Sequence, residues 1–239
     1  MWRLIVDSVS CVYASAMTRQ FFHVAYLIGG LSFFSTPSLA TDLTAQFDAR
    51  HKTCLESIAD DAQDAFEAAM QWRDQGGGRR AKHCVAMALF ALGHEEEAAF
   101  RLDALAAGAD GGSNETRVKH YAEAANFWLT ANDAEKAYAS ASAGLKLEYD
   151  HLDLRIARAR AYALYGRYDF AETDLTSVLT LDPVHAGALR YRADARFKLE
   201  KIDSALADIE AALKLDPTSV ETALLRGQIR EAIRVAEEQ

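Results

Sequence analysis

The chain has 239 residues, 50% hydrophobic and 26% charged, a composition typical of one or two globular domains. Its net charge of −9 argues against the broad basic surface that nucleic-acid binding requires, and it makes anionic membranes poor partners. Only 3 prolines interrupt the chain, and good helix formers dominate after residue 60, so we expect helices rather than strands.

The first forty residues have the pattern of an export signal. Met17–Gln20 gives a short positive start, Phe21–Phe34 an apolar core, and Ser38–Ala40 small residues before a cleavage site. We predict a signal peptide over residues 1–40, with Met17 the better start, and therefore a bacterial periplasmic or secreted protein. The apolar run of roughly 14 residues is shorter than the ~20 that a membrane span needs. An uncleaved anchor or a buried helix stays open, but we expect no stable membrane insertion after cleavage.

Two cysteines, Cys54 and Cys84, would remain after cleavage, and an even number in an exported protein indicates a disulfide. Each falls in a predicted helix, Leu43–Ile58 and Ala81–Leu92, with the helix Asp61–Arg73 between them. First and third helices of a helical array are neighbours, so the two side chains can meet. Closing a loop of about 30 residues would stabilise the fold by on the order of 3 kcal/mol.

Three alternatives remain for these cysteines. They could be buried, reduced thiols, or they could join His51 and His83 in a zinc site of two cysteines and two histidines. The second is disfavoured because the adjacent His83 and Cys84 point about 100° apart on a helix. The third is a catalytic Cys–His pair, which no other feature supports. We therefore predict no metal and no cofactor.

Residues 41–78 are predicted as a divergent helical hairpin that ends at the glycines 76–78. After it, similar residues recur 34 positions apart, for example Leu181-Asp182-Pro183 and Leu215-Asp216-Pro217. A fixed period of this length is typical of helix–turn–helix repeats. The sequence predicts four repeats, 79–112, 118–151, 152–185 and 186–217, followed by a capping helix over 218–239.

Three positions of the repeat carry the pattern. Alanine occupies the eighth and twentieth positions, where two helices would cross closely. The members are Ala86, Ala125, Ala159 and Ala193 at the eighth, and Ala98, Ala137, Ala171 and Ala205 at the twentieth. Turn residues occupy the fifteenth, namely Gly93, Asn132, Gly166 and Glu200.

On these residues the chain resembles the tetratricopeptide repeat (TPR) family over about 140 residues. The resemblance implies an all-α fold, a right-handed superhelix of antiparallel helix pairs. The sequence departs from the family pattern in a few places. Arg158 and Arg192 replace an expected leucine, Arg196 replaces an aromatic residue, and Tyr149 replaces a proline. Because Asp174 and Asp208 share the same 34-residue offset as the first two arginines, we expect ion pairs between facing helices.

The resemblance also implies a concave binding surface, lined by the first helix of each pair. The candidate partner-binding residues on it are Lys119, Asn126, Arg160, Arg190, Asp194, Phe197 and Lys198. Its cations could hold carboxylates, with arginine forming two parallel hydrogen bonds. The chaperone-type carboxylate clamp of the family needs a lysine where this chain has Ala122, so that activity is not inferred.

The sequence has no phosphate-binding glycine loop, no His-x-x-x-His pair and no Gly-x-Ser-x-Gly motif. The resulting prediction is a non-enzymatic scaffold of the bacterial cell envelope that binds a protein or peptide partner. Two alternatives stay open. One is a structural subunit of an envelope complex that uses its convex or end surfaces, and the other is a cysteine-based redox or metal-handling protein.

Overall fold

The computed structural model describes residues 39–238, with side chains from residue 42 onward, and this part contains eleven α-helices and no strand. The predicted signal segment lies outside the described residues except for Leu39 and Ala40, which begin the first helix. The helices are α1 (Leu39–Ser57), α2 (Ala62–Asp74), α3 (Gly78–Ala91), α4 (Glu95–Ala107), α5 (Asn114–Thr130), α6 (Ala134–Leu147), α7 (Leu152–Leu164), α8 (Tyr168–Leu181), α9 (Ala186–Lys198), α10 (Ile202–Leu215) and α11 (Val220–Glu237). Within residues 39–238, no helix combines the length and the apolar character that crossing a membrane would require.

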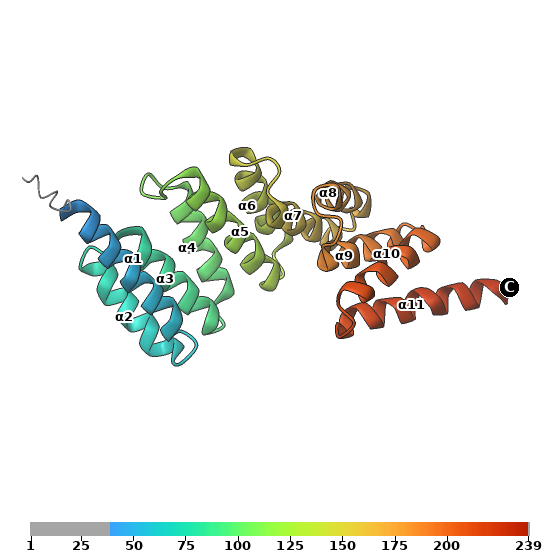
Figure 1. Ribbon diagram of the computed structural model, residues 1–239, viewed down its shortest axis with the longest axis horizontal. Helices are drawn as coiled ribbons and strands as arrows, with labels where there is room; N and C mark the ends of the chain where they lie inside the picture. Colours follow the sequence, from blue (N-terminus) through green and yellow to red (C-terminus); the bar gives the residue numbers. More distant parts are fainter. Residues whose placement is uncertain (1–38, 239) are drawn as a thin grey trace, which may run out of the picture. The chain divides into compact units, whose positions relative to one another are not determined.

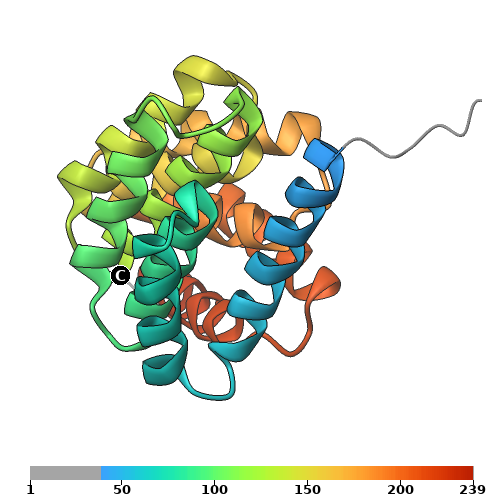
Figure 2. The ribbon, with the colours of Figure 1, turned by 90° about the vertical axis from the view of Figure 1, so that its left-hand side faces the viewer.

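Each helix packs against the next along the chain, from α1 to α11 (Figure 1). In addition, α5 packs against α7 and α7 against α9, so the first helices of successive pairs lie side by side. Figure 2, viewed along the row of helices, shows successive helix pairs arranged around a common axis. This is the all-α arrangement of stacked antiparallel helix pairs that the sequence predicts, and the fold class is confirmed.

The four turn residues of the repeats all adopt the left-handed backbone conformation. Their φ angles are 80° at Gly93, 59° at Asn132, 70° at Gly166 and 61° at Glu200. In each turn the following N–H donates to a carbonyl five residues back, as in His94 to Leu89 at 2.9 Å and Lys201 to Arg196 at 2.9 Å. The same turn therefore ends the first helix of each pair, α3, α5, α7 and α9, although only two of the four positions hold glycine.

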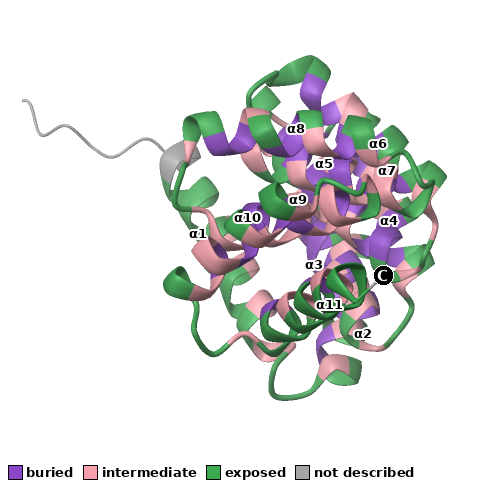
Figure 3. Ribbon diagram, turned by 90° about the vertical axis from the view of Figure 1, so that its right-hand side faces the viewer, coloured by how far each residue is buried: buried purple, intermediate pink, exposed green. Residues whose placement is uncertain are grey.

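The alanines at the eighth and twentieth positions form the centre of each pair. All eight are at most 1% exposed, because any larger side chain would separate the crossing helices. Leu102, Leu175 and Ile209 fill the space behind them and are also at most 1% exposed. Figure 3 shows the buried residues gathered where helices face one another, while the outer faces are exposed. Each pair therefore buries its apolar face against the next pair.

The first three helices are held together covalently. Cys54 on α1 and Cys84 on α3 form a disulfide with their Cα atoms 6.3 Å apart, as the spacing of the predicted helices suggested. The two thiols are therefore not available as metal ligands or nucleophiles, which excludes the zinc and Cys–His alternatives built on them. The loop between α4 and α5 is held by hydrogen bonds from one side chain. Arg117 donates to the carbonyl oxygens of Ala106, Gly108 and Gly112.

The expected ion pairs between facing helices are confirmed. Arg158 on α7 donates two hydrogen bonds of 2.7 Å to the carboxylate of Asp174 on α8. One repeat later, Arg192 on α9 donates two of 2.8 Å to Asp208 on α10. Arg196 also reaches Asp208 at 2.8 Å. The departures from the family pattern at these three arginines are therefore internal ion pairs of the last two repeats.

Candidate functional site

An apolar hollow of about 210 Å³ opens on the surface formed by α5, α7 and α9, which we call the first-helix surface. Its lining residues come from these three helices and from α8. They are Leu129, Ala159, Arg160, Ala163, Leu164, Ala171, Leu175, Tyr191 and Asp194. The floor is aliphatic and the rim carries one cation, one carboxylate and one aromatic ring. Such a hollow can take an apolar side chain while its rim binds polar groups beside it.

Two arginines stand over the ring of Tyr191 at the rim of this hollow. The guanidinium carbon of Arg190 lies 4.2 Å from the ring centroid, and that of Arg160 lies 5.3 Å from it. Arg160 also donates from Nη1 to Oδ1 of Asn126 at 3.0 Å. The amide and the aromatic ring hold the guanidinium of Arg160 in place without neutralising it.

Six arginines lie on α7 and α9, and they divide into two groups. Four of them bind carboxylates within the chain: Arg155, Arg158, Arg192 and Arg196. Arg160 and Arg190 form no ion pair with any carboxylate among residues 39–238. These two guanidinium groups, both at Tyr191, are therefore free to bind an anion from outside.

Asp194 lies one turn after Arg190 and one turn before Lys198 on α9, and it is half-buried at the hollow. Burial raises the pKa of Asp194 above its ordinary value of 3.8, although the charges of Lys198 and Arg190 oppose the shift. In the part of the chain that the structure describes, no hydrogen bond reaches its carboxylate. A partially dehydrated, unpaired carboxylate can accept hydrogen bonds from a bound partner.

The structure brings together only part of the predicted binding residues. Asn126, Arg160, Arg190 and Asp194 gather at the hollow. Phe197 packs into the core against α10 and α11, and Lys198 lies beside its ring at 6.0 Å. Lys119 pairs with Glu115 at 2.7 Å and lines a different cavity.

Tyr191, which the sequence reasoning missed, organises the rim of the hollow. It follows Arg190 directly in the sequence, at the sixth position of its repeat. The sequence signal that could have indicated Tyr191 is its position between two arginines, Arg190 and Arg192.

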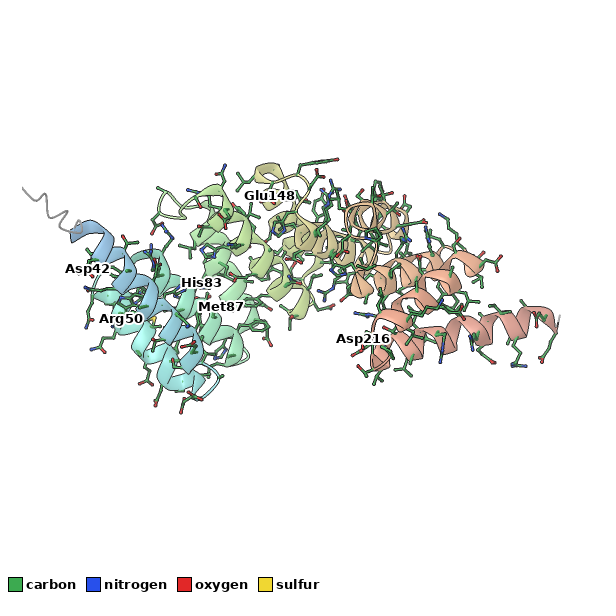
Figure 4. All side chains as sticks on the ribbon, in the orientation of Figure 1. Asp42, Arg50, His83, Met87, Glu148 and Asp216 are labelled. Carbon is green, nitrogen blue, oxygen red and sulfur yellow. A yellow bond between two sulfur atoms is a disulfide. The ribbon has the colours of Figure 1, made fainter. Side chains whose placement is uncertain are left out.

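A second polar cluster joins α1, α3 and α5 in the front part of the array, where Figure 4 labels His83. Nε2 of His51 lies 2.9 Å from Nδ1 of His83, and Nε2 of His83 lies 2.9 Å from Oε2 of Glu123. Nδ1 of His120 lies 3.4 Å from the same carboxylate oxygen. The sequence reasoning grouped His51 and His83 with the cysteines and missed His120 and Glu123. Their three-residue spacing, which places both on one side of a helix, was the signal.

The electrostatics of this cluster follow from its burial. Burial lowers the pKa of His51 to about 4, and the neighbouring charge of His83 acts in the same direction. Burial alone would raise the pKa of Glu123, but hydrogen bonds and charge from His120 and His83 hold it at about 2. At neutral pH the cluster therefore holds an ionised carboxylate against a row of imidazole rings.

The whole arrangement is similar to solved tetratricopeptide repeat structures. TTC0263, a thermophilic TPR protein of Thermus thermophilus, superposes with a TM-score of 0.56 at 17% identity, covering 75% of this chain and 98% of that one. MamA 41-end from Desulfovibrio magneticus RS-1 superposes with a TM-score of 0.57 at 17% identity, covering 65% of this chain and 85% of that one. The fold is therefore an α-solenoid of stacked helix pairs, similar to that of tetratricopeptide repeat structures.

Sequence comparison adds one relative. A stretch of 65 residues, 27% of this chain, is 37% identical to tetratricopeptide repeat protein 34 of Mus musculus. This stretch spans only 12% of the mouse protein, so the likeness concerns the repeat and not the whole protein. No family model matches the chain.

Proposed function

We propose that this protein is a non-enzymatic scaffold that binds an acidic peptide segment on its first-helix surface. One observation carries the proposal. Of the six arginines on α7 and α9, the two without a carboxylate partner in the described chain stand over the same aromatic ring, at the edge of an apolar hollow. Exposed apolar recesses that are rimmed by polar or charged side chains usually mark sites of interaction with a partner.

The geometry suggests how a peptide would bind. A side-chain or terminal carboxylate would bind to Arg160 and Arg190, which can each donate two parallel hydrogen bonds. An aliphatic side chain next to it would fill the hollow over Leu129 and Leu175. Asp194 would accept a hydrogen bond from the peptide backbone. Affinity would then depend on one buried apolar anchor and one charge pair, with no chemical step.

We further propose that the protein acts in the cell envelope. The pattern of residues 1–40 supports export, and a cysteine pair bridged between α1 and α3 supports an oxidising compartment. Cell fractionation with a C-terminal tag tests this point, because a cytoplasmic pool alone would contradict it.

The binding proposal is tested with an array of peptides that vary in acidic and aliphatic residues. We expect enrichment of peptides in which a carboxylate neighbours an aliphatic side chain. Charge reversal of both arginines, Arg160→Glu with Arg190→Glu, should weaken binding at least tenfold. The matched control is Lys146→Glu with Lys214→Glu, which changes the net charge equally at exposed positions in the last turns of α6 and α10. Equal binding by the two double variants would contradict the proposal.

A second candidate, a structural subunit of a larger complex, is favoured by one observation on α4. Phe100 is 61% exposed and lines a separate hollow of about 260 Å³ with Val85 and Leu105. A large exposed ring beside apolar side chains is typical of a protein contact. Under this function, Phe100→Ser would abolish assembly while the double arginine variant would assemble normally.

A further inference from the structure

Three side chains that can bind a metal converge between α3 and α5. They are His83, His120 and Glu123, whose ligand atoms all lie within 4.8 Å of one another. His83 and His120 are 7% and 6% exposed, and Glu123 is half-buried. We propose that these three residues bind a divalent first-row transition cation of the Zn²⁺ type. The proposal does not depend on the peptide-binding function.

The donor set selects the class of cation. Two imidazole nitrogens with one carboxylate oxygen suit Zn²⁺ and its neighbours, whereas Ca²⁺ and Mg²⁺ prefer oxygen ligands throughout. Ligand atoms about 2.0–2.1 Å from a tetrahedral zinc ion stand roughly 3.3 Å apart. The contacts of Oε2 of Glu123, 2.9 Å to His83 and 3.4 Å to His120, already lie close to that spacing. The three ligand atoms lie within 4.8 Å of one another, so side-chain rotations that bring the two imidazole nitrogens up to about 1.5 Å closer would complete the site.

A further histidine orients the first of these ligands. Nε2 of His51 lies 2.9 Å from Nδ1 of His83, on the side of the ring away from Glu123. Histidines that bind metals usually donate their second N–H to a fixed acceptor, which sets the tautomer and the ring orientation. The disulfide between Cys54 and Cys84 joins the same two helices, one turn from His51 and next to His83. The bridge therefore holds His51 against its partner ring.

His120 is less firmly fixed. Its Nδ1 makes one long contact of 3.4 Å, and its Nε2 is buried without a hydrogen-bond partner in the described part of the chain. A buried nitrogen without a partner costs free energy, and in most buried rings both nitrogens are satisfied. A ring held so weakly can direct a lone pair toward a cation.

The site is open to solvent on one side. A cavity of about 270 Å³ is lined by the cluster and by cationic side chains at its mouth. Two of these cations are neutralised by partners, Arg80 by Asp48 and Lys119 by Glu115. Arg79 has no carboxylate partner within residues 39–238. The cavity thus leaves room for water or an anion as the remaining metal ligand, and the cation would bind with an open coordination position.

The test is titration of the full-length, disulfide-intact protein with ZnCl₂ against a chromophoric chelator, with CoCl₂ as an optical probe of coordination. We expect one equivalent of Zn²⁺ per chain and a visible absorption typical of tetrahedral Co²⁺. Glu123→Gln and His120→Gln should each weaken Zn²⁺ binding by at least 100-fold. His51→Gln, which removes only the orienting ring, should weaken it by about 10-fold. The control is His94→Gln, because His94 is exposed and its side chain caps no helix.

The outcomes separate a metal site from a network of hydrogen bonds. The proposal is overturned if the unaltered protein binds no Zn²⁺, or if Glu123→Gln and His120→Gln bind it as tightly as His94→Gln does. If a buried variant fails to fold, NMR of the unaltered protein decides. Substoichiometric Co²⁺ should then shift or broaden the ring resonances of His83 and His120 and leave those of His94 unchanged. Equal effects on all three histidines would contradict the site.

Discussion

Successive helices pack against one another in both the front of the array, α1 to α5, and its back, α7 to α10, but different interactions join them in the two regions. In the back, the Arg158–Asp174 pair recurs as Arg192–Asp208 with nearly identical distances. In the front, a disulfide and the His51–His83–Glu123 chain connect the helices, and the rings of Phe90 and Phe127 stack at 3.7 Å. The back keeps the 34-residue period, whereas residues 41–78 do not.

This difference shows what a repeat period requires. A pair of charges on facing helices stabilises each unit in the same way, so repeating it keeps the sequence periodic. The disulfide and the histidine contacts act only between the helices that carry them, so α1 and α2 could depart from the period while the helices stay packed. All repeats from α3 to α10 share the buried alanines, because two helices can cross closely only where the side chains are small.

The largest effect is expected from breaking the charge pairs of the back. Asp174→Ala removes the carboxylate that Arg158 and the 4% exposed Arg155 share, and it leaves Arg155 with Asp150 alone. Breaking a buried ion pair costs about 3–5 kcal/mol, and because Asp150 still compensates Arg155, urea denaturation should show a loss of about 3 kcal/mol. Asp203→Ala, at an exposed site in the first turn of α10, is the control and should cost a few tenths. Similar losses in both variants would mean that the pair does not stabilise the back.

Reduction of the disulfide should act on the front alone. The bridge joins residues 30 positions apart, and opening such a loop costs on the order of 3 kcal/mol. Hydrogen exchange with and without a reductant measures this locally, because amides of α1 to α3 should exchange faster while those of α7 to α10 should not change. Faster exchange throughout would show that the two regions are not independent.

A smaller, stabilising effect is expected at the last repeat turn. Glu200 adopts a φ of 61°, which costs a residue with a side chain about 1 kcal/mol relative to glycine. Glu200→Gly should therefore raise the free energy of unfolding by about 0.5–1 kcal/mol. Asn132→Gly, at a φ of 59°, should gain less because asparagine tolerates this conformation. A loss of stability in Glu200→Gly would contradict the strain.

The smallest effect is a pH dependence at the hollow. Burial raises the pKa of Asp194 in the folded protein, so its ionised form destabilises the fold. Its stabilising contribution is present below the unfolded pKa and is lost as the pH rises through the folded pKa. Asp194→Asn should therefore be more stable than the unaltered protein at neutral pH. The gain should disappear as the pH falls below about 3.8, and thermal unfolding across pH measures it. A gain that persists at low pH would contradict this cause.

Much of the fold was predictable because it depends on local, repeated features. The alanine positions and the four turn residues fixed the helix pairs, and the shared offset of Arg158 and Arg192 predicted their ion pairs. The cysteine pair was predictable from the order of the helices. These features depend on spacing within one or two repeats, which the sequence displays directly.

The candidate sites were only partly predictable, because they depend on contacts that have no period. The repeat pattern located Arg160 and Arg190, but it could not tell that their neighbours leave them unpaired while Arg158 is bound. The histidine cluster joins three helices at unequal spacings, so no sequence period reveals it. Such contacts depend on the rotation between successive helices, which only the structure provides.

The most direct test compares the two kinds of arginine in this array. Arg160→Gln with Arg190→Gln should leave the free energy of unfolding nearly unchanged and weaken binding of an acidic peptide at least tenfold. Arg158→Gln with Arg192→Gln should do the reverse and unfold at lower urea concentration, because Asp174 and Asp208 each lose the arginine that donates two hydrogen bonds and keep only Arg155 and Arg196. If Arg160→Gln with Arg190→Gln leaves peptide binding intact, the first-helix surface is not the binding surface. If these substitutions unfold the protein, the two arginines stabilise the fold and are not free to bind a partner.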